Sequence, residues 1–163
     1  YSVAVQFGKI VFFFPISVSF VMFPKITQLY TLKKDTSKVF LKYLILVLFM
    51  CLTITSLYYI APNFMVNLFF GEQYLNSTNL IFLYGINMTL YSLIFVFINY
   101  FLSINYKRIS IIVLFFALVQ FISIWFIHDS LIRVLQIVFI NSFLINLICF
   151  LILFLKKIKL DFS

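Results

Sequence analysis

Five long apolar stretches constrain the fold of this chain more than any other feature. A helix rises about 1.5 Å per residue, so about 20 apolar residues cross a hydrocarbon core about 30 Å thick. With 65% hydrophobic and only 10% charged residues, the chain lies outside the range of soluble domains. The sequence therefore predicts an all-α integral membrane protein, a bundle of five transmembrane helices. The expected spans are residues 3–23, 39–60, 80–103, 109–127 and 132–155.

The cations gather beside every second turn between these stretches. The turn at 61–78 holds no cation, and the turn after residue 127 has one nearby, Arg133. By the positive-inside rule the cation-rich turns are cytoplasmic. We therefore expect segments 24–42 and 104–108 and the C-terminus in the cytoplasm, with 61–78 outside, in a multi-pass protein of the cytoplasmic membrane. Ten of the twelve lysines and arginines form the cation-rich places: Lys25, Lys33, Lys34, Lys38 and Lys42; Lys107 and Arg108; Lys156, Lys157 and Lys159.

The organisation of the chain indicates one domain. No linker rich in Pro, Gly or Ser divides it, so residues 1–163 are expected to form a single transmembrane helical domain. The first residue is Tyr1, and the first stretch lacks the basic start and the small-residue cleavage site of a signal peptide. We therefore expect this chain to be the C-terminal part of a longer protein, with the N-terminal half of that protein as its partner.

The outer turn between the second and third stretches has a helical pattern of its own. Gly71 follows this pattern and suits a helix C-cap, and Ser77 or Thr78 suits the N-cap of the third span. We expect a short helix that lies in the membrane interface. The apolar residues that share one face of it are Phe64, Met65, Leu68 and Phe69.

Packing between the helices is expected to depend on large side chains. The chain has three glycines and no G-x-x-x-G motif, so close contact through small residues is not expected. Cys51 and Cys149 fall inside predicted spans and are interpreted as small core hydrophobes. Four amides within the spans do not share one stripe and are interpreted as polar contacts between helices: Gln120, Gln136, Asn141 and Asn146.

Lys9 is the leading candidate functional residue because it lies inside the first span. It precedes Pro24 by fifteen residues, which places it about 22 Å from the inner end. A lysine at the centre of a span costs about 2.5–3.5 kcal/mol, so it should face a water-filled cavity or a partner. Gln6, Lys9 and Ser17 share one face with Phe13, and we interpret this face as an anion-binding wall. The alternative is a lysine that snorkels to the outer headgroups.

Two further features of the spans have competing interpretations. Pro15 removes a backbone hydrogen bond in mid-span and suits a hinge, although many membrane helices carry a proline and do not move. Tyr84, Asn87 and Tyr91 share one face of the third span and could bind sugar hydroxyls. Asn87 could equally join two helices by a hydrogen bond, and that interpretation is the favoured one.

Several classes of function find no support in the sequence. His128, Asp129 and Ser130 are adjacent in a tight turn, a spacing that cannot bring a nucleophile, a base and an orienting group to one point. No paired carboxylates, Gly-rich phosphate loop or metal cluster occurs, and the four acids lie outside the spans. The net charge of +8 sits mostly at helix ends, where lipid headgroups account for it, so no nucleic-acid partner is expected. The sequence predicts no enzyme, catalytic residue, metal or cofactor.

Two segments of the chain resemble a known transporter family. The first runs from Tyr1-Ser2-Val3-Ala4 through Gly8-Lys9-Ile10 to Phe23-Pro24-Lys25-Ile26-Thr27, with a basic residue early in the helix before a proline and a short polar turn. The second is Leu68-Phe69-Phe70-Gly71-Glu72-Gln73-Tyr74, which is similar to a recurrent "fGxxY" segment. Both resemble the polysaccharide flippases of the multidrug/oligosaccharidyl-lipid/polysaccharide exporter superfamily. The resemblance implies the last five spans of a transporter with twelve to fourteen helices.

The resemblance also implies an activity and a partner. Such proteins flip a polyprenyl-pyrophosphate-linked oligosaccharide to the outer leaflet by alternating access, with cations in the cavity that hold the pyrophosphate. Among embedded residues, that role falls on Lys9. The small residues usual in this helix are here largely Phe and Ile. The alternatives are a cation-coupled drug exporter, which usually needs an embedded acid; an integral membrane enzyme of polysaccharide assembly; and a scaffold, which would tolerate loss of the Lys9 charge.

Overall fold

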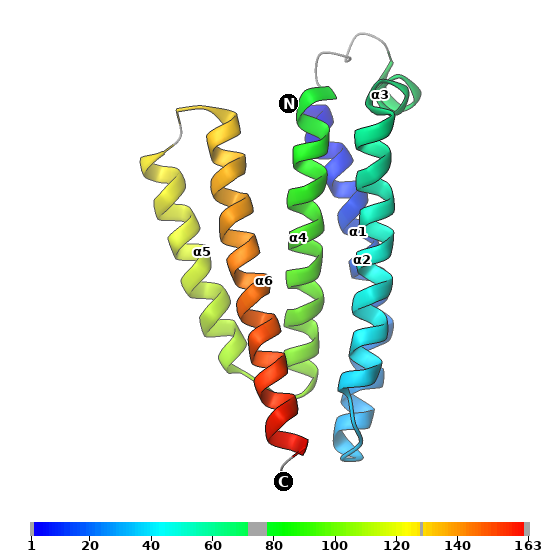
Figure 1. The fold of residues 1–163 in the computed structure, drawn as a ribbon, viewed down its shortest axis with the longest axis vertical. Coiled ribbons are helices and arrows are strands. Elements are labelled where there is room, and N and C mark those ends of the chain that lie inside the picture. Colours follow the sequence, from blue (N-terminus) through cyan, green and yellow to red (C-terminus); the bar gives the residue numbers. More distant parts are fainter. Residues whose placement is uncertain (1, 72–77, 128, 162–163) are drawn as a thin grey trace.

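A computed structural model of the chain describes residues 2–71, 78–127 and 129–161, and all regular structure within them is helical (Figure 1). The helices are α1 (Ser2–Thr31), α2 (Ser37–Ile60), α3 (Pro62–Phe70), α4 (Thr78–Ser103), α5 (Arg108–Phe126) and α6 (Leu131–Asp161). Five of them are long and apolar enough to cross a membrane: Ala4–Thr31, Ser37–Ile60, Leu80–Ser103, Arg108–Phe126 and Leu131–Leu155. The predicted five-helix architecture is confirmed, and its span limits are close to those observed except at the end of the first helix.

The first helix continues beyond its predicted apolar limit. α1 contains both Pro15 and Pro24 and ends at Thr31, so the polar residues after Pro24 extend the helix. Two residues after the end of α1, Lys33 has a left-handed backbone conformation, with a φ of 54°. Asn105, in the turn between α4 and α5, has the same conformation, with a φ of 58°. In each turn the next amide donates to a carbonyl oxygen five residues earlier, at 2.9 Å and 2.8 Å. These bonds satisfy helix-end carbonyls as a terminal glycine motif would.

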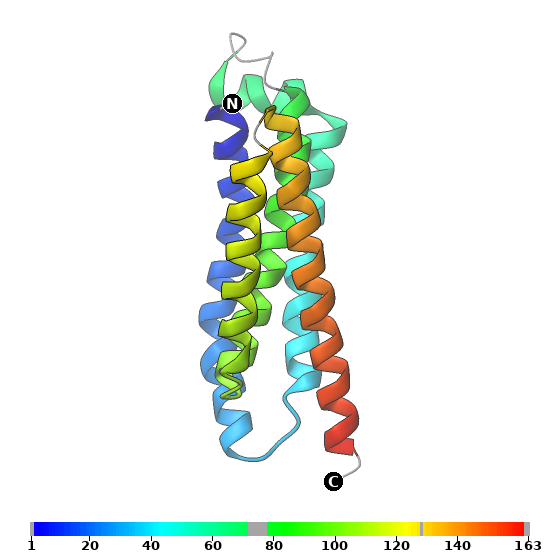
Figure 2. The same ribbon diagram turned by 90° about the vertical axis from the view of Figure 1, so that its left-hand side faces the viewer.

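α4 is the central helix of the bundle. It packs against each of the other five helices, while α5 packs mainly against α6. Figure 1 shows α1 and α2 on one side of α4 and the α5–α6 pair on the other. The turned view in Figure 2 shows that the long helices all run close to the long axis of the molecule. The connection between α5–α6 and the remaining helices is therefore made chiefly through α4.

The outer surfaces of the long helices are apolar. Large side chains that remain exposed occur on every one of them, among them Phe20, Phe49, Phe121, Phe139 and Phe154. Helices that are apolar on the outside as well as the inside are characteristic of membrane spans. The exposed surface thus agrees with the composition in indicating a helical membrane protein.

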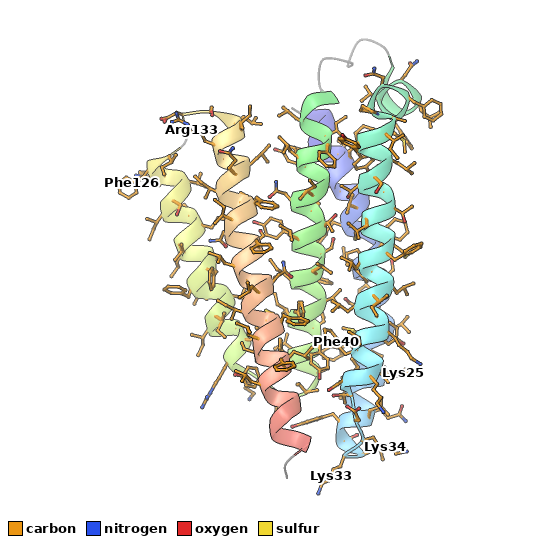
Figure 3. All side chains as sticks on the ribbon, viewed as in Figure 1. Lys25, Lys33, Lys34, Phe40, Phe126 and Arg133 are labelled. Carbon is orange, nitrogen blue, oxygen red and sulfur yellow. The ribbon has the colours of Figure 1, made fainter. Side chains whose placement is uncertain are left out.

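The charged turns segregate to the two ends of the bundle. Lys25, Lys33 and Lys34 lie at one end, here called the basic end, and Arg133 lies at the other, the opposite end (Figure 3). The α4–α5 turn and the last turns of α6 are also at the basic end (Figure 1). At the opposite end Arg133 forms an ion pair with Asp129, so that cation is balanced. This separation agrees with the predicted alternation of turns, and the side of the membrane that each end faces stays a prediction.

Two glycines correct the expectation that large side chains dominate all helix contacts. A β-carbon added at Gly8 of α1 would lie 2.9 Å from Met88 Cγ on α4. One added at Gly85 of α4 would lie 3.0 Å from Tyr58 Cδ2 and 3.2 Å from Thr55 Cγ2 on α2. The expectation was wrong at these places, because a single glycine is enough to let a neighbouring side chain reach a helix backbone without a G-x-x-x-G repeat.

The short helix predicted in the outer turn is present as α3. Its predicted face remains open, since Phe64, Leu68 and Phe69 are exposed and Met65 is half-buried. Gly71 ends the helix with a φ of 87°, and its N–H bonds to carbonyl oxygens of the last turn. An exposed apolar face beside the opposite end of the bundle fits a position in the membrane interface. The predicted cap at Ser77, and the residues Glu72 and His128, lie outside the described residues.

Candidate functional site: the outward face of α1

The predicted polar stripe on α1 is a single face, and it points away from the bundle. Gln6, Lys9 and Ser17 are exposed, and Phe13 between them is 70% exposed. The residues of α1 that are fully buried against other helices, among them Phe7, Val11 and Met22, occupy the other side of the helix. The face defined by Gln6, Lys9, Phe13 and Ser17, here called the α1 outward face, therefore lies on the surface of this five-helix bundle and does not line its interior.

No acidic side chain in the part of the chain that the structure describes forms an ion pair with Lys9. Lys9 also forms no hydrogen bond with any residue in the described ranges. Asp35 lies in the α1–α2 turn at the basic end, and Asp129 is paired with Arg133. Ser17, the other hydroxyl-bearing member of the face, donates to the Phe13 carbonyl oxygen at 3.3 Å. The α1 outward face therefore offers an ammonium group whose donors are not used by any described residue.

Pro15 is buried, and the carbonyl group that it leaves free is bonded to another helix. A proline cannot donate to the carbonyl four residues earlier, which here belongs to Val11. The Cys51 thiol on α2 lies 3.9 Å from that carbonyl oxygen and donates to it. One turn earlier, Tyr58 Oη donates to the Phe7 carbonyl oxygen at 3.0 Å. The part of α1 that precedes Pro15 is thus attached to α2, so a bend at Pro15 would move these two segments together.

The predicted sugar-binding residues of the third span are separated from the α1 outward face. Tyr84 and Asn87 are buried, with 8% and 3% of their surface exposed. Tyr91 is half-buried and exchanges hydrogen bonds with Gln120 of α5, at 2.8 Å and 3.0 Å. The favoured interhelical hydrogen bond of Asn87 is not found among the described residues, because its Nδ2 donates to Leu83 O of the same helix. The five predicted site residues therefore form two groups, one on the surface and one inside the bundle.

Three of the four amides interpreted as polar contacts between helices make such contacts. Gln120 bonds to Tyr91, Asn141 Nδ2 donates to the Phe116 carbonyl oxygen at 3.2 Å, and Asn146 Nδ2 donates to Leu90 O at 3.0 Å. Gln136 is the exception, since it is exposed on α6. These bonds connect α4, α5 and α6, so the interpretation is confirmed for the three buried or half-buried amides.

A groove that the sequence analysis missed lies beside the α1 outward face. It has a volume of about 410 Å³ and is formed by α1 and α4. Ser19 is buried at its wall without a hydrogen-bond partner for its hydroxyl. Pro24 cannot donate to the Phe20 carbonyl, so that carbonyl lacks its helical donor. The pair of prolines was visible in the sequence, but their relation to α4 was not. The lining residues are Ile16, Ser19, Phe20, Phe23, Pro24, Phe95 and Asn99.

The described residues hold no group of three His, Cys, Asp or Glu side chains that could bind a metal ion. Cys51 and Cys149 are buried free thiols on different helices, as interpreted from the sequence. Comparison of the chain with protein-family models, with curated proteins and with solved structures gave no match. The resemblance to the flippases rests on the two quoted segments.

Proposed function

We propose that this chain forms part of a transporter that flips a polyprenyl-pyrophosphate-linked oligosaccharide across the cytoplasmic membrane. The observation that carries the proposal is Lys9, an ammonium group that no described residue pairs with, inside a candidate span and on a face that no described helix covers. A pyrophosphate is the kind of ligand that gains most from such a group, because hydrogen bonds between charged partners are about twice as strong as neutral ones.

The location of Lys9 on the surface of the bundle supports a second half of the transporter. Left in contact with lipid, the ammonium group would carry much of the cost of burying a charge in a span, about 2.5–3.5 kcal/mol at the centre. A second group of helices packed near the α1 outward face would turn this face into one wall of a hydrated cavity. The missing N-terminal half of a two-lobed transporter would supply such helices.

The distribution of the other cations suits entry of an anionic headgroup from the basic end. Lys25, Lys33 and Lys34 are exposed there, where each can attract an anionic lipid headgroup by about 1 kcal/mol. Lys9 lies about 22 Å further along α1 than Pro24. A headgroup that leaves the lysines at the basic end and is then held by Lys9 would have crossed most of the bilayer. With the basic end in the cytoplasm, that path leads toward the outer leaflet.

The remaining requirement is space for an apolar lipid tail. Phe13 and Phe20 on the exposed side of α1 are apolar and open, with 70% and 77% of their surface exposed. A prenyl chain can lie against such a surface without losing hydrogen bonds. The drug-exporter alternative would require an acid from another part of the protein, because the acids of this chain lie outside the spans.

Complementation of a flippase-deficient strain tests the proposed function. The complete protein should restore surface polysaccharide, while residues 1–163 expressed alone at equal membrane abundance should not, because one lobe does not make a two-sided cavity. Failure of the complete, well-expressed protein in every polysaccharide background tested would argue against the flippase. Export by residues 1–163 alone would refute the two-lobed arrangement.

A further inference from the structure

The interface between α4 and α6 contains buried oxygen atoms whose hydrogen-bonding capacity is unused. Asn87 of α4 and Ser142 of α6 are 3% and 0% exposed, and Asn146 of α6 is half-buried. Asn87 Oδ1, Ser142 Oγ and Asn146 Oδ1 are all buried, and none has a hydrogen-bond partner among the residues that the structure describes. All three residues lie well inside the candidate spans Leu80–Ser103 and Leu131–Leu155. Polar atoms in such a position rarely lack a hydrogen bond, because the hydrocarbon region of a membrane holds no water that could bond to them.

These three oxygen-bearing side chains lie at nearly the same level of the bundle. α4 and α6 both begin at the opposite end and finish at the basic end (Figure 1). The 3.0 Å bond from Asn146 Nδ2 to Leu90 O fixes their register. Asn87 precedes Leu90 by three residues, and Ser142 precedes Asn146 by four, so each lies about 5 Å further toward the opposite end. Asn87 and Ser142 therefore lie at about the same level of the bundle, one turn closer to the opposite end than the Asn146–Leu90 bond.

The seven-residue spacing on α6 supports this placement. Leu135, Ser142 and Cys149 recur every seven residues and are all buried. Such a row faces one neighbouring helix continuously, and the bond of Asn146 identifies that neighbour as α4. Ser142 is the small, polar member of the row, and it lies at the level of Asn87.

The amide nitrogens of the cluster already donate to backbone carbonyl oxygens. Asn87 Nδ2 already donates to Leu83 O, and Asn146 Nδ2 donates to Leu90 O and Ser142 O. The two amide oxygens that remain can only accept, so they cannot bond to each other. The Ser142 hydroxyl has a single hydrogen and can satisfy at most one of them. Asn87 Nδ2 also keeps a second hydrogen, but no described hydrogen bond directs it to either amide oxygen. A ligand that donates two hydrogen bonds and accepts one would satisfy all three oxygens.

We propose that one ordered water molecule occupies this position and bridges α4 and α6. It donates to Asn87 Oδ1 and Asn146 Oδ1 and accepts a hydrogen bond from the Ser142 hydroxyl. Buried waters typically make about three such bonds. A neutral ligand suits the cluster because the oxygens carry no formal charge and the spans contain no acid. The water joins the α5–α6 pair to the central helix.

The exchange Ser142→Ala distinguishes a hydrated cluster from a dry one by the sign of its effect. In a hydrated cluster the serine is a partner of the water, and its loss should lower the melting temperature of the purified protein by about 2–4 °C. In a dry cluster the serine hydroxyl is a buried polar group without a hydrogen-bond partner, and its removal should leave the melting temperature unchanged or raise it. Ser123→Ala on α5 is the control for the intrinsic effect of this exchange on a helix. A change in melting temperature equal to that of the control, or a rise relative to it, would overturn the proposal.

A second variant tests whether the residues share one ligand. Asn87→Leu and Ser142→Ala should each be destabilising, while the double variant should lose less than the sum of the two, because the water bridge is lost only once. Strictly additive losses would contradict a shared water. Structure determination of the unmodified protein in lipid nanodiscs gives the direct readout. Density about 2.7–3.2 Å from at least two of the three oxygens is expected; a dry interface, or a cation at shorter distances, would overturn the proposal.

Discussion

The Cys51 thiol on α2 lies 3.9 Å from the Val11 carbonyl oxygen on α1, the acceptor that Pro15 leaves without its helical donor. The bond connects a sequence feature inside one helix with a side chain forty residues away. It also explains how a proline is accommodated in the middle of a span, where a free carbonyl would have no solvent partner. The contact predicts that Pro15 and Cys51 are energetically coupled.

Cys51→Ala should therefore destabilise the protein only while Pro15 is present. We expect a loss of about 0.5–1.5 kcal/mol for the hydrogen bond, beyond the packing loss measured with Cys149→Ala, the other buried free thiol. Pro15→Ala restores a backbone donor for Val11, so the added cost of Cys51→Ala should disappear in that background. Thermal unfolding in detergent measures the four proteins of the cycle. Equal costs in both backgrounds would show that the thiol has no role at the proline.

Gly85→Ala is expected to cost about 1–3 kcal/mol of stability through overpacking. The new β-carbon would lie 3.0 Å from the Tyr58 ring. The Tyr58 ring cannot move away easily, because Tyr58 Oη donates a hydrogen bond to Phe7 O at 3.0 Å. The ring also packs against the Phe7 ring, with 5.1 Å between the two ring centroids.

Gly8→Ala provides the comparison for this exchange. Its β-carbon would meet the flexible side chain of Met88 at 2.9 Å, so the loss should be smaller than that of Gly85→Ala. Denaturation of both variants in the same detergent ranks them. The reverse ranking would contradict the view that Tyr58 is the fixed partner.

The hydrogen bonds between Tyr91 and Gln120 should contribute to the attachment of α5. α5 is the least buried of the five candidate spans. Tyr91→Phe and Gln120→Leu should show a coupling energy of about 0.6 kcal/mol, the average for such bonds within a membrane. Gln136→Leu, at an exposed amide of α6, is the control and should show no coupling with Tyr91→Phe. A coupling of zero at the Tyr91–Gln120 pair would mean that apolar contacts alone hold α5.

The orientation can be tested at one residue from each end of the bundle. In a variant without Cys51 and Cys149, a cysteine placed at Asn63 of α3 should react with a membrane-impermeant maleimide on intact cells. A cysteine at Lys34 should react only after permeabilisation, since the positive-inside rule places it in the cytoplasm. Both positions are exposed, so access to the side chain is equal. Labelling of Lys34 but not Asn63 on intact cells would reverse the topology.

The helices of this protein could be predicted from the sequence, but the faces through which they pack against one another could not. Length and apolar composition specify the spans, and Gly71 specifies the end of α3, because these signals are local. The positions of Gly8 and Gly85 depend on which neighbour each helix selects, and in lipid that choice is made by shape rather than by hydrophobicity. The same limit applies to the candidate site. The spacing of Gln6, Lys9 and Ser17 predicts a shared face, but only the packed structure reveals that it points outward.

The burial of Tyr84 and Asn87 could not be predicted from the sequence either. Both residue types are common in ligand-binding sites and in helix interfaces, so residue type and spacing do not separate the two roles. Gly8 of α1 packs close to Tyr84, since a β-carbon added at Gly8 would lie 3.7 Å from Tyr84 Cδ1. The contact between these two helices, rather than any property of α4 alone, decides that Tyr84 is an interior residue.

The measurement that tests the central claim most directly is glycan export by Lys9 variants of the complete protein. A charged hydrogen bond contributes about 1.5–3 kcal/mol, so Lys9→Ala should reduce export at least about tenfold at unchanged membrane abundance. Lys9→Arg should retain part of the activity, because the charge is kept while the geometry differs. Lys42→Ala, at an exposed lysine near the basic end of α2, is the control and should export normally. Full export by a well-expressed Lys9→Ala variant would contradict the proposal that Lys9 binds the pyrophosphate.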